Sequence, residues 1–231
     1  MKTKIILFLL LIVYAISGTA QSDYISMKLS DFMSSKKIIS GETIEELDES
    51  EINGSAYLNK EFINGTIYTA QKEKFTDVPL RFNVYSDDME FKNQNNEIMA
   101  IAAPENIEKI EIGELSFKYI PYMAGQKIKN GFFELVTDGN ASLYIRHEII
   151  FKEAEKAGAY KEASPPSFIN NPNEYYIQIG KNAATLVKNK KSLQEMFPDN
   201  KDKVETFIKK NNIKTNEAES IAELVNYYNS L

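Results

Sequence analysis

The chain has 231 residues with no cysteine, no tryptophan and one histidine, and its 33 acidic residues outnumber 27 basic ones, for a formal net charge of −6. This composition excludes a disulfide framework, thiolate chemistry and a histidine-rich metal site, and we expect no metal and no cofactor. The acidic balance argues against nucleic acid as a partner, because that binding depends on neutralising phosphates.

Residues 1–20 have the parts of an export signal. Lys2 and Lys4 precede the apolar run "IILFLLLIVYAI", and the small residues Gly18 and Ala20 follow it. The pattern predicts cleavage after Ala20, and the run is too short to span a bilayer comfortably. Without the leader the chain loses two of its basic residues and none of its acidic ones, for a net charge of about −8.

This leader predicts where the protein goes. We expect an exported protein of the periplasm or outer membrane, or a secreted one. No later segment is long and apolar enough for a transmembrane helix, although peripheral membrane association stays open. Residues 21–51 follow the leader; they are polar and lack a sustained period, which predicts a flexible N-terminal segment.

Residues 52–152 are typical of an antiparallel β-meander. Short runs rich in β-branched and aromatic residues, such as "PLRFNVY", "IEKIEI" and "GFFELV", alternate with turn residues. Gly113-Glu114 and Asp138-Gly139 predict tight hairpin turns, and "YSDDMEF" and "FKNQNNEIM" predict two more reversals. Asp87 and Asp88 are expected to be solvated turn residues.

Residues 119–131, "YIPYMAGQKIKNG", are the best candidate for a mobile or recognition loop, because the segment is longer than a hairpin needs. A tolerated insertion is the alternative. The candidate binding residues are Tyr119, Tyr122, Lys127, Lys129 and Arg146.

Residues 143–151, "LYIRHEIIF", contain the one histidine next to one of the two arginines. Alternation predicts a single long strand with His147 on the apolar face and Arg146 on the other. The two side chains would then not cooperate, and we interpret His147 as a satisfied core or rim residue. No P-loop, nucleophile elbow or zinc-protease motif is found, so we assign no catalytic residue.

Residues 153–173 contain Pro165, Pro166 and Pro172 and predict a stiff, extended connector. Residues 174–231 predict a strand, "EYYIQIG", and then three short amphipathic helices. Their apolar stripes must pack on each other, on the sheet or on a partner. Asn216 and Glu219 have the spacing of a capping box for the last helix.

Several stretches, among them "GSAYLNKEFINGTIYT", "VPLRFNVYSDDMEF", "GFFELVTDGNASLYIR" and "KKSLQEMFPDNKDKVETFIKKNNI", resemble a family of uncharacterised exported proteins of Bacteroidota. The likeness covers residues 54–231. It implies a periplasmic or outer-membrane location and no activity, so it identifies no catalytic residue.

Together these features predict an α+β fold: an antiparallel β-meander, as an open barrel or sandwich-like sheet, followed by a small C-terminal bundle of short helices. The expected function is non-enzymatic, through binding a small ligand or an envelope protein partner, or as an accessory subunit. A carboxylate-based hydrolase is the alternative.

Overall fold

A computed structural model describes residues 36–37, 52–157 and 162–231 of the chain. The predicted export signal (1–20) and nearly all of the predicted flexible segment (21–51) lie outside these residues. No helix in the described part is long and apolar enough to cross a membrane.

The strands form one large sheet and one small one. An 11-stranded sheet has the order β1-β5-β4-β3-β2-β6-β7-β8-β9-β12-β13, and β10 pairs with β11 in a 2-stranded sheet. Every pairing between these strands is antiparallel. The strands are β1 (Lys36–Lys37), β2 (Ile63–Thr69), β3 (Lys74–Asn83), β4 (Asp88–Lys92), β5 (Ile98–Ala100), β6 (Ile107–Ile112), β7 (Leu115–Ala124), β8 (Lys127–Thr137), β9 (Ala141–Arg146), β10 (Ile149–Lys152), β11 (Ser167–Asn170), β12 (Glu174–Ile179) and β13 (Thr185–Leu186).

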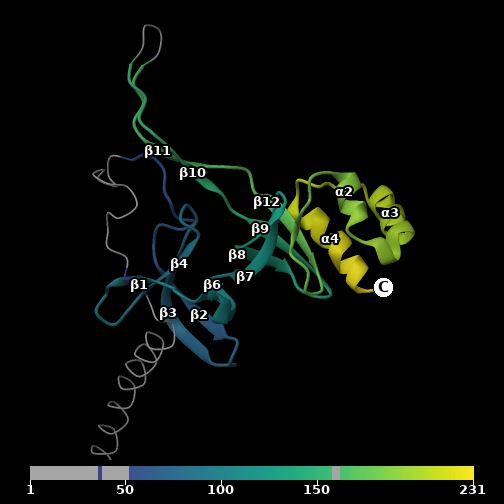
Figure 1. The fold of residues 1–231 in the computed structure, drawn as a ribbon, viewed down its shortest axis with the longest axis horizontal. Helices are drawn as coiled ribbons and strands as arrows, with labels where there is room; N and C mark the ends of the chain where they lie inside the picture. Colours follow the sequence, from purple (N-terminus) through teal and green to yellow (C-terminus); the bar gives the residue numbers. More distant parts are fainter. Residues whose placement is uncertain (1–35, 38–51, 158–161) are drawn as a thin grey trace, which may run out of the picture.

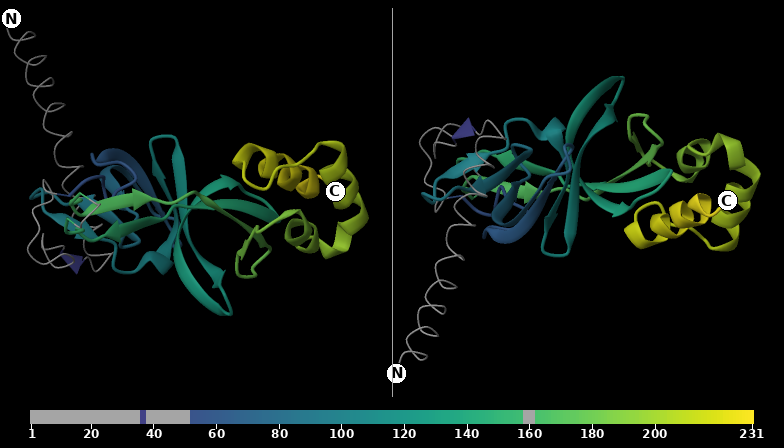
Figure 2. Two further views of the ribbon diagram at one scale, coloured as in Figure 1. Left: turned by 90° about the horizontal axis from the view of Figure 1, so that it is seen from above. Right: turned by 90° about the horizontal axis from the view of Figure 1, so that it is seen from below.

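Helices complete the fold after the last strand. They are α2 (Lys190–Glu195), α3 (Lys201–Lys210) and α4 (Ala218–Asn229), with a short 3-10 turn at Pro198–Asn200 between α2 and α3. A second 3-10 turn, Pro104–Asn106, lies earlier in the chain, between β5 and β6. The helices gather at one end of an elongated molecule and β2 to β6 lie at the other (Figures 1 and 2). The predicted α+β class, an antiparallel meander with C-terminal helices, is confirmed at this level.

The predicted reversals are present. Gly113-Glu114 joins β6 to β7 with φ of +58° at Gly113, a backbone conformation that glycine adopts without steric cost. Asp138 and Gly139 lie in the turn from β8 to β9, and the segments between β3 and β4 and between β4 and β5 also reverse the chain.

The prediction of a loop at residues 119–131 is wrong. The segment forms the two arms of a long hairpin, β7 and β8, which stay paired up to Ala124 and Lys127 around a two-residue turn. Gly125 in that turn has φ of +65°. The two glycines suggested a loop, but Gly131 is a paired strand residue opposite Ile120.

The prediction that residues 143–151 form a single strand is also wrong. β9 ends at Arg146, and the chain leaves the large sheet before β10 begins at Ile149. β10 then pairs with β11, which lies inside the predicted connector, 153–173. That connector therefore folds back as a hairpin that extends away from the sheet (Figure 1). The prolines were misleading because Pro165, Pro166 and Pro172 flank β11 without interrupting it.

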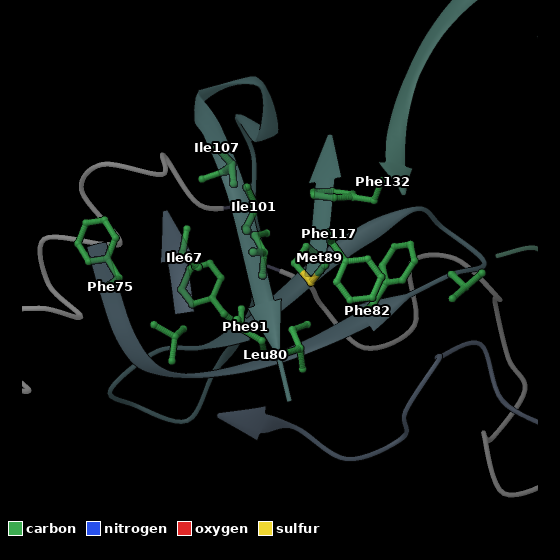
Figure 3. Close-up of a cluster of buried hydrophobic side chains, with 14 of the residues drawn as sticks. Ile67, Phe75, Leu80, Phe82, Met89, Phe91, Ile101, Ile107, Phe117 and Phe132 are labelled. Atoms are coloured by element: carbon green, nitrogen blue, oxygen red, sulfur yellow. The ribbon is translucent and has the colours of Figure 1, made fainter. Parts of the chain in front are cut away.

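Three apolar clusters fill the interior. The first lies among β2 to β8, with Ile149 of β10, and is rich in Phe and Ile; its side chains point toward one another in Figure 3. The second joins β9 and β12 to all three helices. The third lies on the opposite face of β7, β8, β9 and β12 and contains Ile120, Tyr122, Phe133, Tyr144, Tyr176 and Ala184.

Ala184 helps to enclose the third cluster. Its N–H donates to the carbonyl of Pro121 and its carbonyl accepts from the N–H of Met123, both at 2.8 Å. The segment before β13 thus contacts β7, although β8, β9 and β12 lie between β7 and β13 in the order of the sheet. The sheet curls back on itself here and encloses its aromatic rings.

The helical stripes pack on the sheet and on each other. Leu193, Val204, Ile221, Leu224 and Val225 are fully buried in the second cluster with Leu143 and Ile177 of the sheet. The amide of Asn229 also pins α4 to β9, accepting from the N–H of Ala141 at 2.8 Å and donating to its carbonyl at 2.9 Å.

The capping box predicted for α4 is wrong. The helix begins at Ala218 with Glu217 at the N-cap position and no side-chain cap, so Asn216 lies one residue too early. A reciprocal capping box does occur at α2, between Asn189 and Ser192.

Candidate functional site

All three guanidinium nitrogens of Arg81, in β3, donate hydrogen bonds within the protein. Its Nη2 and Nε donate to Glu90 at 2.6 and 3.1 Å, and Nη1 donates to the carbonyl of Lys60 at 3.1 Å. The guanidinium also lies 3.6 Å from the centre of the Tyr57 ring. Asn83 donates to the second oxygen of Glu90, which is 1% exposed. This closed, buried network is a structural element.

Arg146, at the end of β9, has weaker partners. Its side chain is 31% exposed, and Glu174 of β12 is the only carboxylate of the described residues within 4 Å, at 3.7 Å from Nη1. The guanidinium lies 5.0 Å from the centre of the Tyr122 ring, a cation–π contact. A guanidinium has five N–H donors. Glu174 and the hydroxyl of Tyr176 occupy part of this donor capacity, and the 31% exposure of the side chain leaves the rest accessible to solvent or to a ligand.

Two tyrosines form the floor beneath Arg146. Tyr122 and Tyr176 are buried, and their rings meet edge to face with centroids 5.7 Å apart. The hydroxyl of Tyr176 donates to Glu174 at 3.2 Å. Burial and the neighbouring Glu174 raise the pKa of this hydroxyl to about 12, against the opposing effect of Arg146, so it stays protonated.

Asp87 reaches the same place from the turn between β3 and β4. The residue as a whole is exposed, but its carboxylate folds back over β8 and accepts from the N–H of Phe132 at 3.2 Å. Desolvation there raises its pKa to about 6, although that hydrogen bond and the charge of Arg146 act in the other direction. No ion pair within 4 Å neutralises Asp87 among the residues described. Asp87 is an exposed turn residue, as expected, and its carboxylate in addition accepts a hydrogen bond from β8.

Gly131 leaves the space in which these side chains meet. A Cβ at this position would lie 2.7 Å from Oδ2 of Asp87 and 3.4 Å from a ring carbon of Tyr122. Asp87 and Tyr122 thus lie over the Gly131 backbone. We call this group the Arg146 cluster; it consists of Asp87, Tyr122, Gly131, Arg146, Glu174 and Tyr176.

The structure brings together two of the five candidate binding residues, Tyr122 and Arg146. Tyr119 lies on the opposite face of β7, where its ring packs against Phe132. Lys127 and Lys129 are exposed on β8, beyond the residues that pair with β9. Glu174 and Asp87 were missed as site residues, because strand pairing and a long-range hairpin contact bring them to Arg146.

His147 contacts a different neighbour. Its Nε2 lies 2.7 Å from Oε2 of Glu134, and both side chains are mostly buried. Ile145, two residues before His147 in the chain, lies directly opposite Glu134 in the pairing of β8 with β9. The prediction that His147 and Arg146 have separate surroundings agrees with these contacts. Among the residues that the structure describes, no group of three or more His, Asp or Glu side chains could hold a metal ion.

A second surface feature lies on the helices. An open hollow of about 530 Å³ is lined by α3 and by Tyr227 of α4. Its base is the stacked pair Phe207 and Tyr227, with ring centroids 4.1 Å apart, and Lys203 and Lys210 lie along it.

No protein-family model, no curated protein and no solved structure matches the chain.

Proposed function

We propose that this chain is an exported envelope protein that acts by binding, either to a small ligand or as an accessory subunit, and that the Arg146 cluster is its binding site. The observation that carries the proposal is the partly exposed guanidinium of Arg146. It is held on a rigid aromatic floor beside the carboxylate of Asp87, and no full ion pair occupies it. Sites that recognise ligands commonly place a few convergent polar groups on an apolar base.

The surroundings of the cluster support binding more than catalysis. Its floor is part of a packed strand core, so the aromatic rings are in place before a ligand arrives, and preorganisation of this kind favours affinity. The export signal predicted at residues 1–20 supports a role in the envelope.

Site-specific crosslinking in the producing cells tests the binding site. A photoreactive residue replaces exposed Ser86, next to Asp87, or Lys203 in the hollow on α3. We expect an adduct of higher mass from position 86 in envelope fractions, and we expect Arg146→Gln in the same chain to abolish it. An adduct from position 203 only, or one that survives Arg146→Gln, would contradict this proposal.

Export is tested separately by fractionation and mass spectrometry. The proposal predicts a mature chain that begins at Gln21 and is recovered with the periplasm or the outer membrane. Recovery of the intact chain from the cytoplasm would contradict it.

A carboxylate-based hydrolase is the second candidate. Burial raises the pKa of Asp87 to about 6, in the range that suits a general acid, and Glu174 supplies a second carboxylate across Arg146. Chromogenic glycosides and esters test this candidate directly. Turnover that disappears in Asp87→Asn and persists in Asp77→Asn would favour a hydrolase over a binding protein.

A further inference from the structure

The charges of the Arg146 cluster restrict which ligand fits it. Asp87 and Glu174 would repel an anion, because two carboxylates surround one guanidinium. Arg146 would repel a cation, and because it lies over Tyr122 it also covers part of the aromatic ring on which a cation could stack. A purely apolar ligand would strip water from all three charged groups without replacing their hydrogen bonds.

Neighbouring hydroxyl groups satisfy this arrangement. A hydroxyl donates one hydrogen bond and accepts others, so it can donate to a carboxylate and accept from a guanidinium at the same time. In the cluster, Glu174 lies 3.7 Å from Nη1 of Arg146, and Asp87 and Arg146 both lie beside the Tyr122 ring. Hydrogen bonds of this kind are charge-assisted and stronger than neutral ones.

Gly131 supplies the room in which the carboxylate of Asp87 lies against Tyr122. Asp87 is held above its backbone by the N–H of Phe132, and any larger side chain at position 131 would push against the carboxylate and the Tyr122 ring. The Tyr122 ring is 5% exposed and lies under Arg146, so the cluster would contact a sugar through its hydroxyl edge.

We infer that the ligand of the Arg146 cluster is a neutral, polyhydroxylated compound, a glycan whose adjacent hydroxyls bridge Asp87 and Arg146. This inference rests on the proposed binding function and names its ligand class. It assigns Asp87 and Glu174 as hydrogen-bond acceptors and Arg146 as the donor.

Calorimetric titration of the purified mature chain with defined sugars tests the ligand class. The probes are neutral hexose disaccharides of differing linkage, an otherwise similar uronic acid and an amino sugar. We expect saturable binding of at least one neutral disaccharide and weaker binding of both charged sugars. Preference for the uronic acid or the amino sugar would overturn the inference.

Matched variants connect that binding to the cluster. Arg146→Gln and Asp87→Asn should each weaken neutral-sugar binding about tenfold or more, since each removes a charge-assisted hydrogen bond. Arg146→Lys should not restore it, because lysine lacks the planar fork. Asp77→Asn is the control: Asp77 is exposed, and its φ is +57°, the same as that of Asp87. Sugar binding that is unchanged in Arg146→Gln overturns the site.

The two proposals can fail separately. If no sugar binds but the crosslinked adduct at position 86 still depends on Arg146, the glycan inference is wrong and the binding function stands. If no sugar binds and position 86 gives no Arg146-dependent adduct, both are wrong.

Discussion

The two arginines of this chain belong to one sheet but meet opposite surroundings. Arg81 has hydrogen bonds at 2.6 and 3.1 Å to a buried carboxylate, and a tyrosine ring covers its guanidinium. Arg146 has one carboxylate at 3.7 Å and an open side. Both stack on aromatic rings, so the aromatic contact alone does not separate structural from functional arginines. What separates them is how many of the donors are already used.

The comparison extends to the acidic partners. Glu90 is enclosed together with Arg81, whereas Asp87 accepts one backbone N–H and has no ion pair within 4 Å among the described residues. A charged group that a protein positions but leaves without a full partner is a candidate for ligand recognition. The variants below test this distinction, beginning with the largest expected effect.

Arg81→Ala should destabilise the protein by about 3–5 kcal/mol, because it leaves the charge of Glu90 buried without its partner. Urea denaturation followed by circular dichroism measures the change in the free energy of unfolding. A loss below about 1 kcal/mol would show that the Arg81 network is not structural, and the comparison would fail.

Leu224→Ala should cost about 2–5 kcal/mol, because this fully buried residue of α4 packs in the cluster that joins the helices to β9 and β12. The same denaturation measurement applies, with exposed Thr206→Ala as the control. An equal and small effect of both substitutions would mean that the helices do not support the strands that carry Arg146.

Gly131→Ala should cost only about 1 kcal/mol in stability, because the new methyl group meets mainly the movable carboxylate of Asp87. Neutral-sugar binding should nevertheless fall as it does for Asp87→Asn. Unchanged binding by a stably folded Gly131→Ala chain would remove Gly131 from the site.

Asp87→Asn should have the smallest effect on stability, and that effect should depend on pH. The folded-state pKa of about 6 lies above the ordinary value of 3.8 for an aspartate, so folding favours the protonated form. The stability that wild type has at low pH is lost as the pH rises through 6, whereas asparagine carries no such penalty.

For this exposed residue the gain of Asp87→Asn at pH 7.5 should be at most about 1 kcal/mol, decreasing toward pH 4. Denaturation at both pH values, with Asp77→Asn alongside, provides the measurement. The same gain at both pH values would show that the carboxylate of Asp87 is not desolvated.

Local signals in the sequence predicted most of the strands and all three helices. Turn chemistry such as Gly113-Glu114 fixes a reversal within a few residues, and the stripe of Ile221, Leu224 and Val225 marks a buried helix face. Signals near residues 119–131 and 153–173 were misread. Glycine and proline suggested loops there, although cross-strand pairing accommodates the glycine and the prolines fall just outside a strand.

The site was harder to predict than the fold. Tyr122 and Arg146 were identified from residue type, but Asp87 joins them only because the turn between β3 and β4 packs over β8, 45 residues further along the chain. Glu174 joins them because β12 pairs with β9, where it lies opposite Arg146. Contacts at such separations leave no periodic pattern in one sequence.

The most direct test of this distinction is to measure stability and ligand binding on the same Arg146→Gln preparation. We predict a free energy of unfolding within about 1 kcal/mol of wild type, because Arg146 is partly exposed and loosely paired, together with loss of neutral-sugar binding. A destabilisation as large as that of Arg81→Ala, or sugar binding equal to wild type, would contradict it.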